Sequence, residues 1–470
     1  MTPKYTRLAL TSVLAIPVMA LGSAMANTLH VDPCSPWSFA SIQEAIDAAY
    51  DFDTIVVHPA VYREHIDYHG AMVTVTGMDA NDPAVVESTI LDGTGTGGVV
   101  TFRNAEGPHS VLRGLTIRNG QNGIECTGAY TAPLIVKCRV ISNAAVGIAC
   151  SLAKPTITET TIENNKSRGI SASSGEISLC RVCTNGSGKD GDAGLADCGG
   201  LVRGCIISGN NGEGVRNQAG EVRNCLISGN LNNGVRFTHL SCNTRCSIVN
   251  CTVVGNRANG MSVDYLGYTA DVAIKNTILV LNGSFGVYGQ GAAHGSGSWG
   301  NVSVDWADVF GNNNGDYYAA LVTLVIGQHN ISQDPSFAKR GYWDTSMVWH
   351  EGDYHLKSKL GRWDPRTSTW VNDPVDSPCL DRGDPTSPFL DEPYPNGGRI
   401  NPGVYGGTAE ASMSPGGVKC LEYPQMDFNH DCKVDQADLD IFMKHWLECG
   451  LDPNTACWPQ GPPPAPRVQP

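Results

Sequence analysis

The sequence predicts an all-β solenoid, in which the chain winds through short strands, one coil after another. The composition agrees, because 470 residues include 54 glycines and 27 prolines and only 17% are charged. Short Val, Ile, Leu, Thr and Cys runs, bounded by Asn and Gly, recur every 20 to 30 residues from about Asn119 onward. Since no helical periodicity lies within the repeat, each repeat is expected to form one coil.

An asparagine comes after each apolar run and marks the same position in every coil. The asparagines are Asn119, Asn143, Asn165, Asn185, Asn210, Asn230, Asn256, Asn282 and, more weakly, Asn312. Coils stack about 4.8 Å apart, so these amides are expected to bond one another as a ladder, at corners that tolerate left-handed backbone. Four residues later a glycine is expected at a corner with positive φ: Gly123, Gly147, Gly169, Gly214, Gly234, Gly260 and Gly286. The apolar residue after each glycine is expected to point inward.

Cysteines form a second repeating position, five residues before the asparagine: Cys138, Cys180, Cys205, Cys225 and Cys251. Cys126 and Cys150 make a further matching pair. We interpret them as buried small hydrophobic residues rather than a metal or redox site. Disulfides between neighbouring coils remain an alternative, since coil spacing suits them. The chain has 17 cysteines, so at least one is unpaired in a monomer.

The N-terminus predicts export. Lys4 and Arg7 precede an apolar run to about Ala20, and small residues follow at cleavage spacing, so residues 1–26 are expected to be a signal peptide. An uncleaved anchor is the alternative, although the run is short for a membrane span of about 20 residues. Without these residues the net charge is −16, which argues against nucleic acid or an anionic membrane as the main partner. No later segment approaches spanning length.

The segment from Ser38 to Ile66 predicts a short helix, with Ile42, Ala45, Ile46 and Ala49 on one face, and then a strand. Such a helix fits a plug over the first coil. SIQEAIDAAYDFDTIVVHPAVYREHI followed by the NG-rich coils resembles secreted right-handed parallel β-helix proteins of the pectate-lyase-like superfamily. The resemblance covers roughly Thr28 to Gly289, and a parallel β-helix with an N-terminal cap is expected over residues 27–330. It does not imply one activity, because the fold carries lyases, hydrolases, esterases, epimerases and non-enzymes.

The stretch 331–412 contains DPSF, GDYHL, SPCLDRGDP and NGGRINPGVYGGTAEAS. It resembles the closing segment of bacterial secreted β-helix proteins, so irregular C-terminal coils and a cap are expected. Four tryptophans in this stretch offer either core packing or a sugar platform: Trp343, Trp349, Trp363 and Trp370.

Residues 413–450 predict a small calcium module, followed by a Pro-rich tail at 451–470. Its loop places oxygen ligands at the spacing calcium requires, with a backbone carbonyl from Lys433: Asp427, Asn429, Asp431, Lys433, Asp435 and Asp438. The module resembles the calcium loop of dockerins, which implies attachment to a cohesin-like or cell-surface scaffold. Two departures weaken that implication, since Cys432 replaces the usual glycine and only one loop is present. The alternative is a solvated loop stapled by disulfides.

Surface chemistry is expected on outward positions. Two arginine pairs over adjacent coils suggest a groove for an acidic polysaccharide, because guanidinium groups match carboxylates: Arg203, Arg216, Arg223 and Arg236. The alternative is that the arginines were copied with the repeat. Candidate carboxylates for hydrolysis lie in the insertion GSGKDGDAGLADCGG, at Asp190, Asp192 and Asp197. Further corner candidates are His239, Asp264 and Tyr265.

Two functions therefore remain open. The first is a secreted carbohydrate-active protein, a lyase or hydrolase that acts on an acidic polysaccharide. The second is a non-catalytic adhesion or glycan-binding rod. No local motif matches a known catalytic set, so the catalytic residues are not assigned and enzymatic activity stays undecided.

Overall fold

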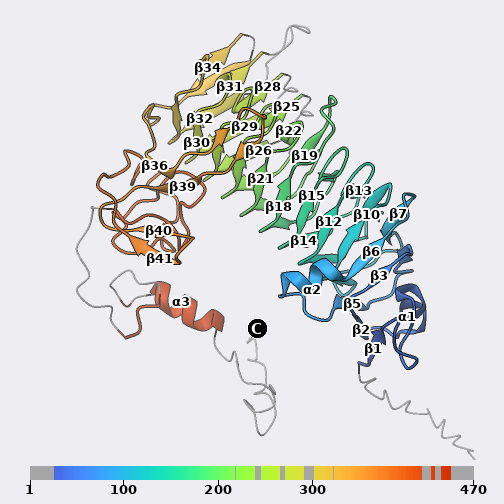
Figure 1. Cartoon of the computed structure of the whole chain (residues 1–470). Coiled ribbons are helices and arrows are strands. Elements are labelled where there is room, and N and C mark those ends of the chain that lie inside the picture. The colour runs from blue at the N-terminus through green and yellow to red at the C-terminus, as the bar shows by residue number, and fades with distance from the viewer. Residues whose placement is uncertain are drawn as a thin grey trace, which may run out of the picture.

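The computed structural model describes residues 26–217, 219–238, 245–264, 270–290, 301–320, 322–414, 425–428, 434 and 436–445. The chain forms a parallel β-helix built from three long parallel sheets, as Figure 1 shows. Each coil contributes one strand to each sheet, so residues about one repeat apart lie side by side. The predicted all-β solenoid is confirmed.

We call the three sheets A, B and C, in the order in which a coil visits them. Sheet A contains β1 (Thr28–Val31), β2 (Thr54–Val57), β5 (Thr74–Gly77), β8 (Val111–Arg113), β11 (Leu134–Val136), β14 (Thr156–Thr158), β17 (Ile177–Ser178), β20 (Val202–Arg203), β23 (Glu221–Arg223), β26 (Arg245–Val249), β29 (Asp271–Lys275), β32 (Asn301–Asp305) and β35 (Thr323–Ile326). Sheet B contains β3 (Val61–Tyr62), β6 (Ile90–Asp92), β9 (Thr116–Arg118), β12 (Arg139–Ile141), β15 (Thr161–Glu163), β18 (Arg181–Cys183), β21 (Ile206–Ser208), β24 (Leu226–Ser228), β27 (Thr252–Val254), β30 (Ile278–Val280) and β33 (Asp308–Phe310). Sheet C contains β4 (Ile66–Asp67), β7 (Gly98–Phe102), β10 (Asn122–Thr127), β13 (Ile148–Ser151), β16 (Ile170–Ser171), β19 (Ala193–Ala196), β22 (Glu213–Arg216), β25 (Val235–Phe237), β28 (Met261–Val263), β31 (Phe285–Gly289) and β34 (Gly315–Ala319).

The core runs along the inside of the solenoid. The apolar residues predicted to point inward are all buried in it: Ile124, Ile148, Ile170, Val215, Val235, Met261 and Val287. Side chains alternate along each strand, so the neighbouring positions, such as Arg216 and Arg236, face outward.

The asparagine ladder forms, and it begins one coil later than predicted. Eight buried side chains from Asn143 to Asn312 are linked, each Nδ2 donating to Oδ1 of the next at 2.9 to 3.1 Å. Asn119 is not part of the ladder, because its amide donates to Asp92 and the neighbouring Gly120 takes the ladder position, its N–H donating to Asn143. The left-handed residue at this corner is the one before each ladder asparagine, for example Thr184 or Gly229.

The positive φ predicted for the repeated glycines is wrong. In the described structure their φ angles are not positive; a side chain there would instead collide with the next coil. At Gly214, a Cβ atom would lie 2.7 Å from Nδ2 of Asn230 and 2.6 Å from the carbonyl oxygen of Gly234. Glycine is therefore required by the close approach of the ladder, and not by backbone conformation.

The five repeated cysteines are buried free thiols, as predicted. Their Sγ atoms lie near carbonyl oxygens, as Cys225 does with Arg223 at 3.2 Å. Cys126 and Cys150 are also free and lie opposite each other in sheet C. The inter-coil disulfide alternative is not realised at these positions.

The predicted N-terminal helix is α1 (Ile42–Ala48), which begins after the N-cap Ser41 and buries Ile42, Ala45 and Ile46. Ala49 ends it as the C-cap. Its role as a plug remains a prediction. A second short helix, α2 (Pro83–Ser88), precedes β6. The expected signal peptide lies outside the described residues, apart from Ala26.

The stretch after β35 does not continue as further coils, which corrects the expectation. Its strands pair with one another in antiparallel hairpins: β36 (Phe337–Lys339) with β39 (Asp353–Leu356), β37 (Tyr342–Trp343) with β38 (Trp349–His350), and β40 (Arg362–Asp364) with β41 (Thr369–Val371). Residues 334–414, which we call the return segment, pack beside the solenoid (Figure 1). Leu226, Val254 and Ile278 of sheet B share a second core with it.

The return segment also follows a column of asparagines at the corner between sheets A and B. Asn224 and Asn250 donate to the carbonyl of Gly406, and Asn276 accepts from Asp384 N. These hydrogen bonds with the return segment explain why asparagine recurs at this corner. Beyond it, the described residues of the C-terminal module include α3 (Gln436–His445). Within the described residues, no helix is long and apolar enough to cross a membrane.

Candidate functional site: the outer face of sheet C

An outward column on sheet C gathers the most chemically informative side chains. Successive coils place Arg216, Arg236, Ser262, Tyr288 and Tyr318 directly next to one another. Each residue follows an inward-facing residue by one position, so strand alternation turns the column away from the core, although Ser262 is covered and only 3% exposed.

The two arginines of this column are not free cations. Arg236 pairs with Glu213 at 2.9 Å and with Asp264 at 2.8 Å, and Arg216 lies 3.7 Å from Glu213. Glu213 is only 2% exposed, so it is a buried acid held between two guanidinium groups. Burial lowers the pKa of Arg236, but the hydrogen bonds that it donates to Glu213 and Asp264 outweigh burial and raise the pKa overall. Arg236 is therefore held as a cation between two acidic side chains.

The third carboxylate near the arginines comes from the insertion loop. Asp190 Oδ1 lies 3.3 Å from Nη1 of Arg216 and 3.6 Å from Nη1 of Arg236, although the Asp190 side chain is 83% exposed. A carboxylate thus lies across both guanidinium groups, supplied by a loop that faces water. A depression of about 440 Å³ adjoins it, lined by Lys189, Asn232, Arg257 and neighbouring residues.

The other two acids of the insertion have structural roles. Asp192 is buried and accepts hydrogen bonds from Ser187 N, Lys189 N and Ser167 Oγ, which fixes the loop. Asp197 pairs with Arg168 at 2.9 Å. No two of the three predicted carboxylates therefore form a pair of catalytic acids.

The remaining predicted arginines lie on a different sheet. Arg203 and Arg223 are neighbours in sheet A, where they pair with Glu176 and Glu221 respectively. The expectation of one cluster of four is wrong, because the two pairs occupy different strands of each coil. Of the other candidates, Asp264 joins the Arg236 network, while His239 and Tyr265 lie outside the described residues.

Two tyrosines extend the sheet C column and Phe285 packs beside them; sequence reasoning missed Phe285 and Tyr318. Tyr288 and Tyr318 stack with centroids 5.1 Å apart and an interplanar angle of 11°. Phe285 stacks on Tyr288 at 5.7 Å and lies tilted against Tyr318 at 5.2 Å. The repeat pattern of the sequence predicts that Tyr288 faces outward. It does not reach Tyr318, because the asparagine and glycine of the repeat are only weakly marked there.

The four tryptophans of the return segment divide into two pairs. Trp349 packs on Gly229 and Gly255 of the solenoid, and Trp343 donates from Nε1 to the Gly255 carbonyl at 2.8 Å. This pair is a docking contact. Trp363 and Trp370 face each other across the β40–β41 hairpin at 5.5 Å.

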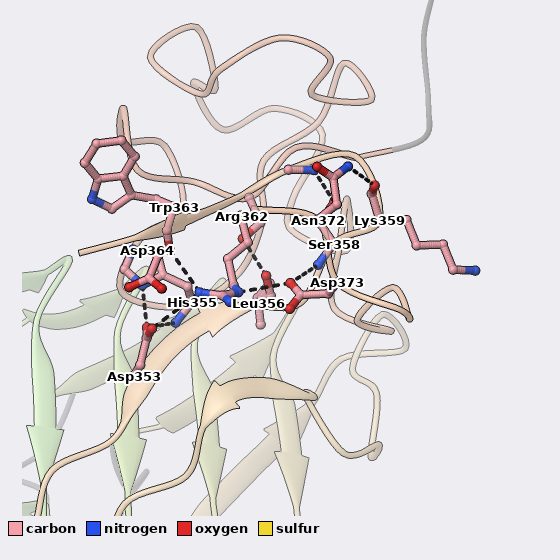
Figure 2. Close-up of polar contacts among 12 residues, drawn as sticks. Asp353, His355, Leu356, Ser358, Lys359, Arg362, Trp363, Asp364, Asn372 and Asp373 are labelled. Carbon is pink, nitrogen blue, oxygen red and sulfur yellow. Dashed lines mark hydrogen bonds and ion pairs between the residues drawn. The ribbon is translucent and has the colours of Figure 1, made fainter. Parts of the chain in front are cut away.

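A polar network inside the return segment holds its hairpins together (Figure 2). Arg362 donates from Nε to Asp373 at 2.9 Å and contacts Asp353 at 3.5 Å, while His355 Nδ1 lies 2.6 Å from Asp353. His355 is buried and stacks on Tyr405 at 3.5 Å. Because these groups bond one another in a buried place, the network is structural.

Only the ends of the predicted calcium loop lie within the described residues. Asp427 and Asp438 are 5% and 2% exposed, and Asp438 Oδ1 accepts from the N–H of Phe428 at 2.7 Å. The first and last ligand positions are thereby brought close, which fits a loop folded around a cation. Asn429, Asp431, Lys433 and Asp435 lie outside the described residues. Among the residues that are described, no group of three or more His, Cys, Asp or Glu could hold a metal ion.

Comparison with known proteins agrees with the fold. Residues 153–276 match the family described as a right handed beta helix region. A search of curated protein sequences found no significant match.

Solved structures that match the chain include several distant likenesses. The A-module of mannuronan C-5 epimerase AlgE4 from Azotobacter vinelandii is 16% identical, with a TM-score of 0.37, covering 63% of this chain and 93% of the module. Pectate lyase Pel9A is 15% identical, with a TM-score of 0.35, covering 82% of this chain and 97% of the lyase. A protein of Geobacillus virus E2 is 11% identical, with a TM-score of 0.36, covering 65% and 60%. At these TM-scores the likenesses say nothing about the site.

Proposed function

We propose that this protein binds an acidic polysaccharide along the outer face of sheet C, with a uronate carboxylate held between Arg216 and Arg236. The observation that carries the proposal is the position of Asp190, whose exposed carboxylate lies 3.3 and 3.6 Å from the two guanidinium groups. A carboxylate from a ligand makes the same charge-assisted contacts.

The network around the arginines allows a ligand carboxylate to replace Asp190 while the other ion pairs stay in place. Glu213 and Asp264 come from the solenoid itself and keep Arg236 oriented in the absence of ligand. Asp190 comes from the insertion loop and its side chain is mostly in water, so moving it away uncovers little apolar surface. A ligand carboxylate then replaces Asp190 while the buried Glu213 still neutralises part of the positive charge.

Binding is favoured over hydrolysis by the partners of the carboxylates. A glycoside hydrolase needs two carboxyl groups that face each other across the bond to be cleaved. Asp190, Glu213, Asp197 and Asp264 instead each pair with an arginine. We therefore propose a glycan-binding protein; a lyase or hydrolase remains an outcome of the test below.

We further infer that the protein is exported and that its C-terminal module binds calcium. The apolar N-terminal run supports export, and the buried Asp427 and Asp438 support a cation between the loop ends. Bound calcium would cross-link the loop and stabilise its exiting helix. Attachment of this module to a cohesin-like or cell-surface scaffold is a further possibility that follows from the dockerin resemblance alone.

The test uses two matched pairs of substitutions. Binding of polygalacturonate, alginate and a neutral glucan is measured by calorimetry for the wild type, Arg216→Ala/Arg236→Ala and Arg203→Ala/Arg223→Ala. The sheet C pair should lose binding to one uronan, while the sheet A pair keeps it. Because the sheet C pair also leaves the buried Glu213 without its arginine partners, binding is compared at a temperature at which melting curves show both double variants to be folded. Asp190→Asn should bind more tightly. Equal binding by both double variants, or preference for the neutral glucan, overturns the proposal.

The same samples test catalysis. New unsaturated sugar ends, followed by ultraviolet absorbance, indicate a lyase, and new reducing ends without that absorbance indicate a hydrolase. Product in either assay replaces the non-catalytic assignment.

A further inference from the structure

We propose that Phe285, Tyr288 and Tyr318, which we call the aromatic platform, form a sugar-stacking subsite that holds a pyranose ring of the polysaccharide bound by the arginines. The inference rests on the proposed function and adds a second contact to it. It also implies that the bound polysaccharide runs along the axis of the solenoid.

The register places the platform in line with the arginines. From Arg236 the same outward position passes to Ser262, then Tyr288, then Tyr318, one coil at a time. With coils about 4.8 Å apart, Tyr318 lies about 14 Å from Arg236 along the axis. A linear polysaccharide whose carboxylate meets Arg216 and Arg236 therefore passes over the platform if it follows the column.

The rings leave apolar surface available to a ligand. Tyr288 and Tyr318 have centroids 5.1 Å apart, more than the distance of about 3.5 to 4 Å at which carbon atoms of two fully overlapped rings touch. The two rings are therefore not fully overlapped, and the ring offered to a ligand is that of Tyr318, on the end strand of sheet C. Tyr318 is 42% exposed. The C–H face of a pyranose ring is apolar and packs on such a surface.

Two residues of the platform, Phe285 and Tyr288, are also anchored by hydrogen bonds before any ligand arrives. Asn259 donates from Nδ2 to Oδ1 of Asn233 at 2.9 Å, and its own Oδ1 accepts from Phe285 N at 3.0 Å. Tyr288 Oη donates to Gln290 Oε1 at 3.0 Å. Side chains that are already ordered lose little entropy on binding, which favours affinity.

The experiment measures binding of a galacturonan hexamer and a glucan hexamer to full-length variants by calorimetry. Tyr318→Ala should weaken binding of the galacturonan about tenfold, the loss expected for one aromatic contact. Tyr318→Phe, which keeps the ring, should bind within about twofold of wild type on the same scale. Tyr342→Ala is the matched control, because Tyr342 is an exposed tyrosine that stacks on His350 in the return segment.

The outcomes separate this inference from the proposed function. If Arg216→Ala/Arg236→Ala abolishes galacturonan binding while Tyr318→Ala leaves it unchanged, the platform is a structural stack and the inference is wrong, although the function stands. If only the glucan binds, and Tyr318→Ala abolishes that binding, the platform is a sugar site and the acidic specificity is wrong. Binding of neither hexamer, together with no binding of alginate by the wild type, overturns both. Melting temperatures of all variants show whether Tyr318→Ala acts through unfolding, in which case Tyr288→Ala repeats the measurement.

Discussion

Cys379 donates a hydrogen bond from Sγ to Oδ2 of Asp308 at 3.2 Å, and both residues are fully buried. Asp308 begins the last strand of sheet B, whereas Cys379 belongs to the return segment. The bond therefore joins the end of the solenoid to the segment that folds back along it.

The stability of this junction should depend on pH. Burial raises the pKa of Asp308 from 3.8 to about 7, with Asp316 and Asp334 adding repulsion. The folded state thus keeps a proton that the unfolded chain releases near pH 4, so the contribution of Asp308 to stability is greatest below that pH and falls as pH rises to about 7.

The measurement is urea unfolding of the wild type and Asp308→Asn between pH 5 and pH 8. As pH rises, the free energy of unfolding of Asp308→Asn should increase relative to that of the wild type, by on the order of 2 kcal/mol over this range. A constant difference would mean that Asp308 does not titrate in the folded protein over this range. Taking the difference removes the effect of other carboxylates.

Removing one ladder amide should destabilise the solenoid strongly. Asn230 Oδ1 accepts from both N and Nδ2 of Asn210, and its Nδ2 donates to the Ile207 carbonyl. Asn230→Ala leaves these buried groups unsatisfied, so the free energy of unfolding should fall by about 3 kcal/mol. Chemical denaturation checks this, with Asn104→Ala at an exposed position as control; equal effects would contradict the ladder's role.

Two glycines should be sensitive because of the tryptophan above them. A Cβ on Gly229 or Gly255 would lie 2.1 Å from the Trp349 ring, whereas a Cβ on Gly209, at the same corner and with a similar φ, meets nothing closer than 3.9 Å. Gly229→Ala should therefore release the β37–β38 hairpin and speed its proteolysis. Gly209→Ala carries the same backbone strain and should not, so equal rates in the two variants would argue against the contact.

Calcium should stabilise the C-terminal module alone. Asp427→Asn/Asp438→Asn removes the two described carboxylates of the loop, so addition of calcium should no longer protect residues after 414 from protease. A wild-type protein whose digestion pattern is identical in calcium and in chelator would show that the module needs no cation. Asp391→Asn, outside the module, is the control.

The sequence predicts the solenoid well because each coil repeats the same local pattern. Ile170, Val215 and Val235 identify the core from spacing alone, and the ladder asparagines follow from the same register. The physical role of the glycines was not predictable in this way, because the collision with Asn230 becomes visible only when two coils are stacked. The return segment was misassigned for a similar reason, since nothing local indicates that Trp349 contacts Gly229.

The site was predicted less completely. The alternation of strands places Arg216 and Arg236 together, and the structure confirms that they are neighbours. Their acidic partners include Glu213, which is close in sequence, and Asp190, which lies in an insertion loop of irregular length. Loop insertions carry no register, so the approach of Asp190 to both arginines depends on tertiary structure.

The ladder has a consequence for how the rod melts. The amide of Asn165 donates forward to Asn185 and backward to the Val140 carbonyl, so one side chain spans three coils. A coil in the middle cannot open without stranding polar groups on both sides, and in a linear array strong coupling between neighbours makes unfolding cooperative over many repeats. An event at one coil, such as capture of a ligand, should therefore delay the unfolding of coils that the ligand never touches.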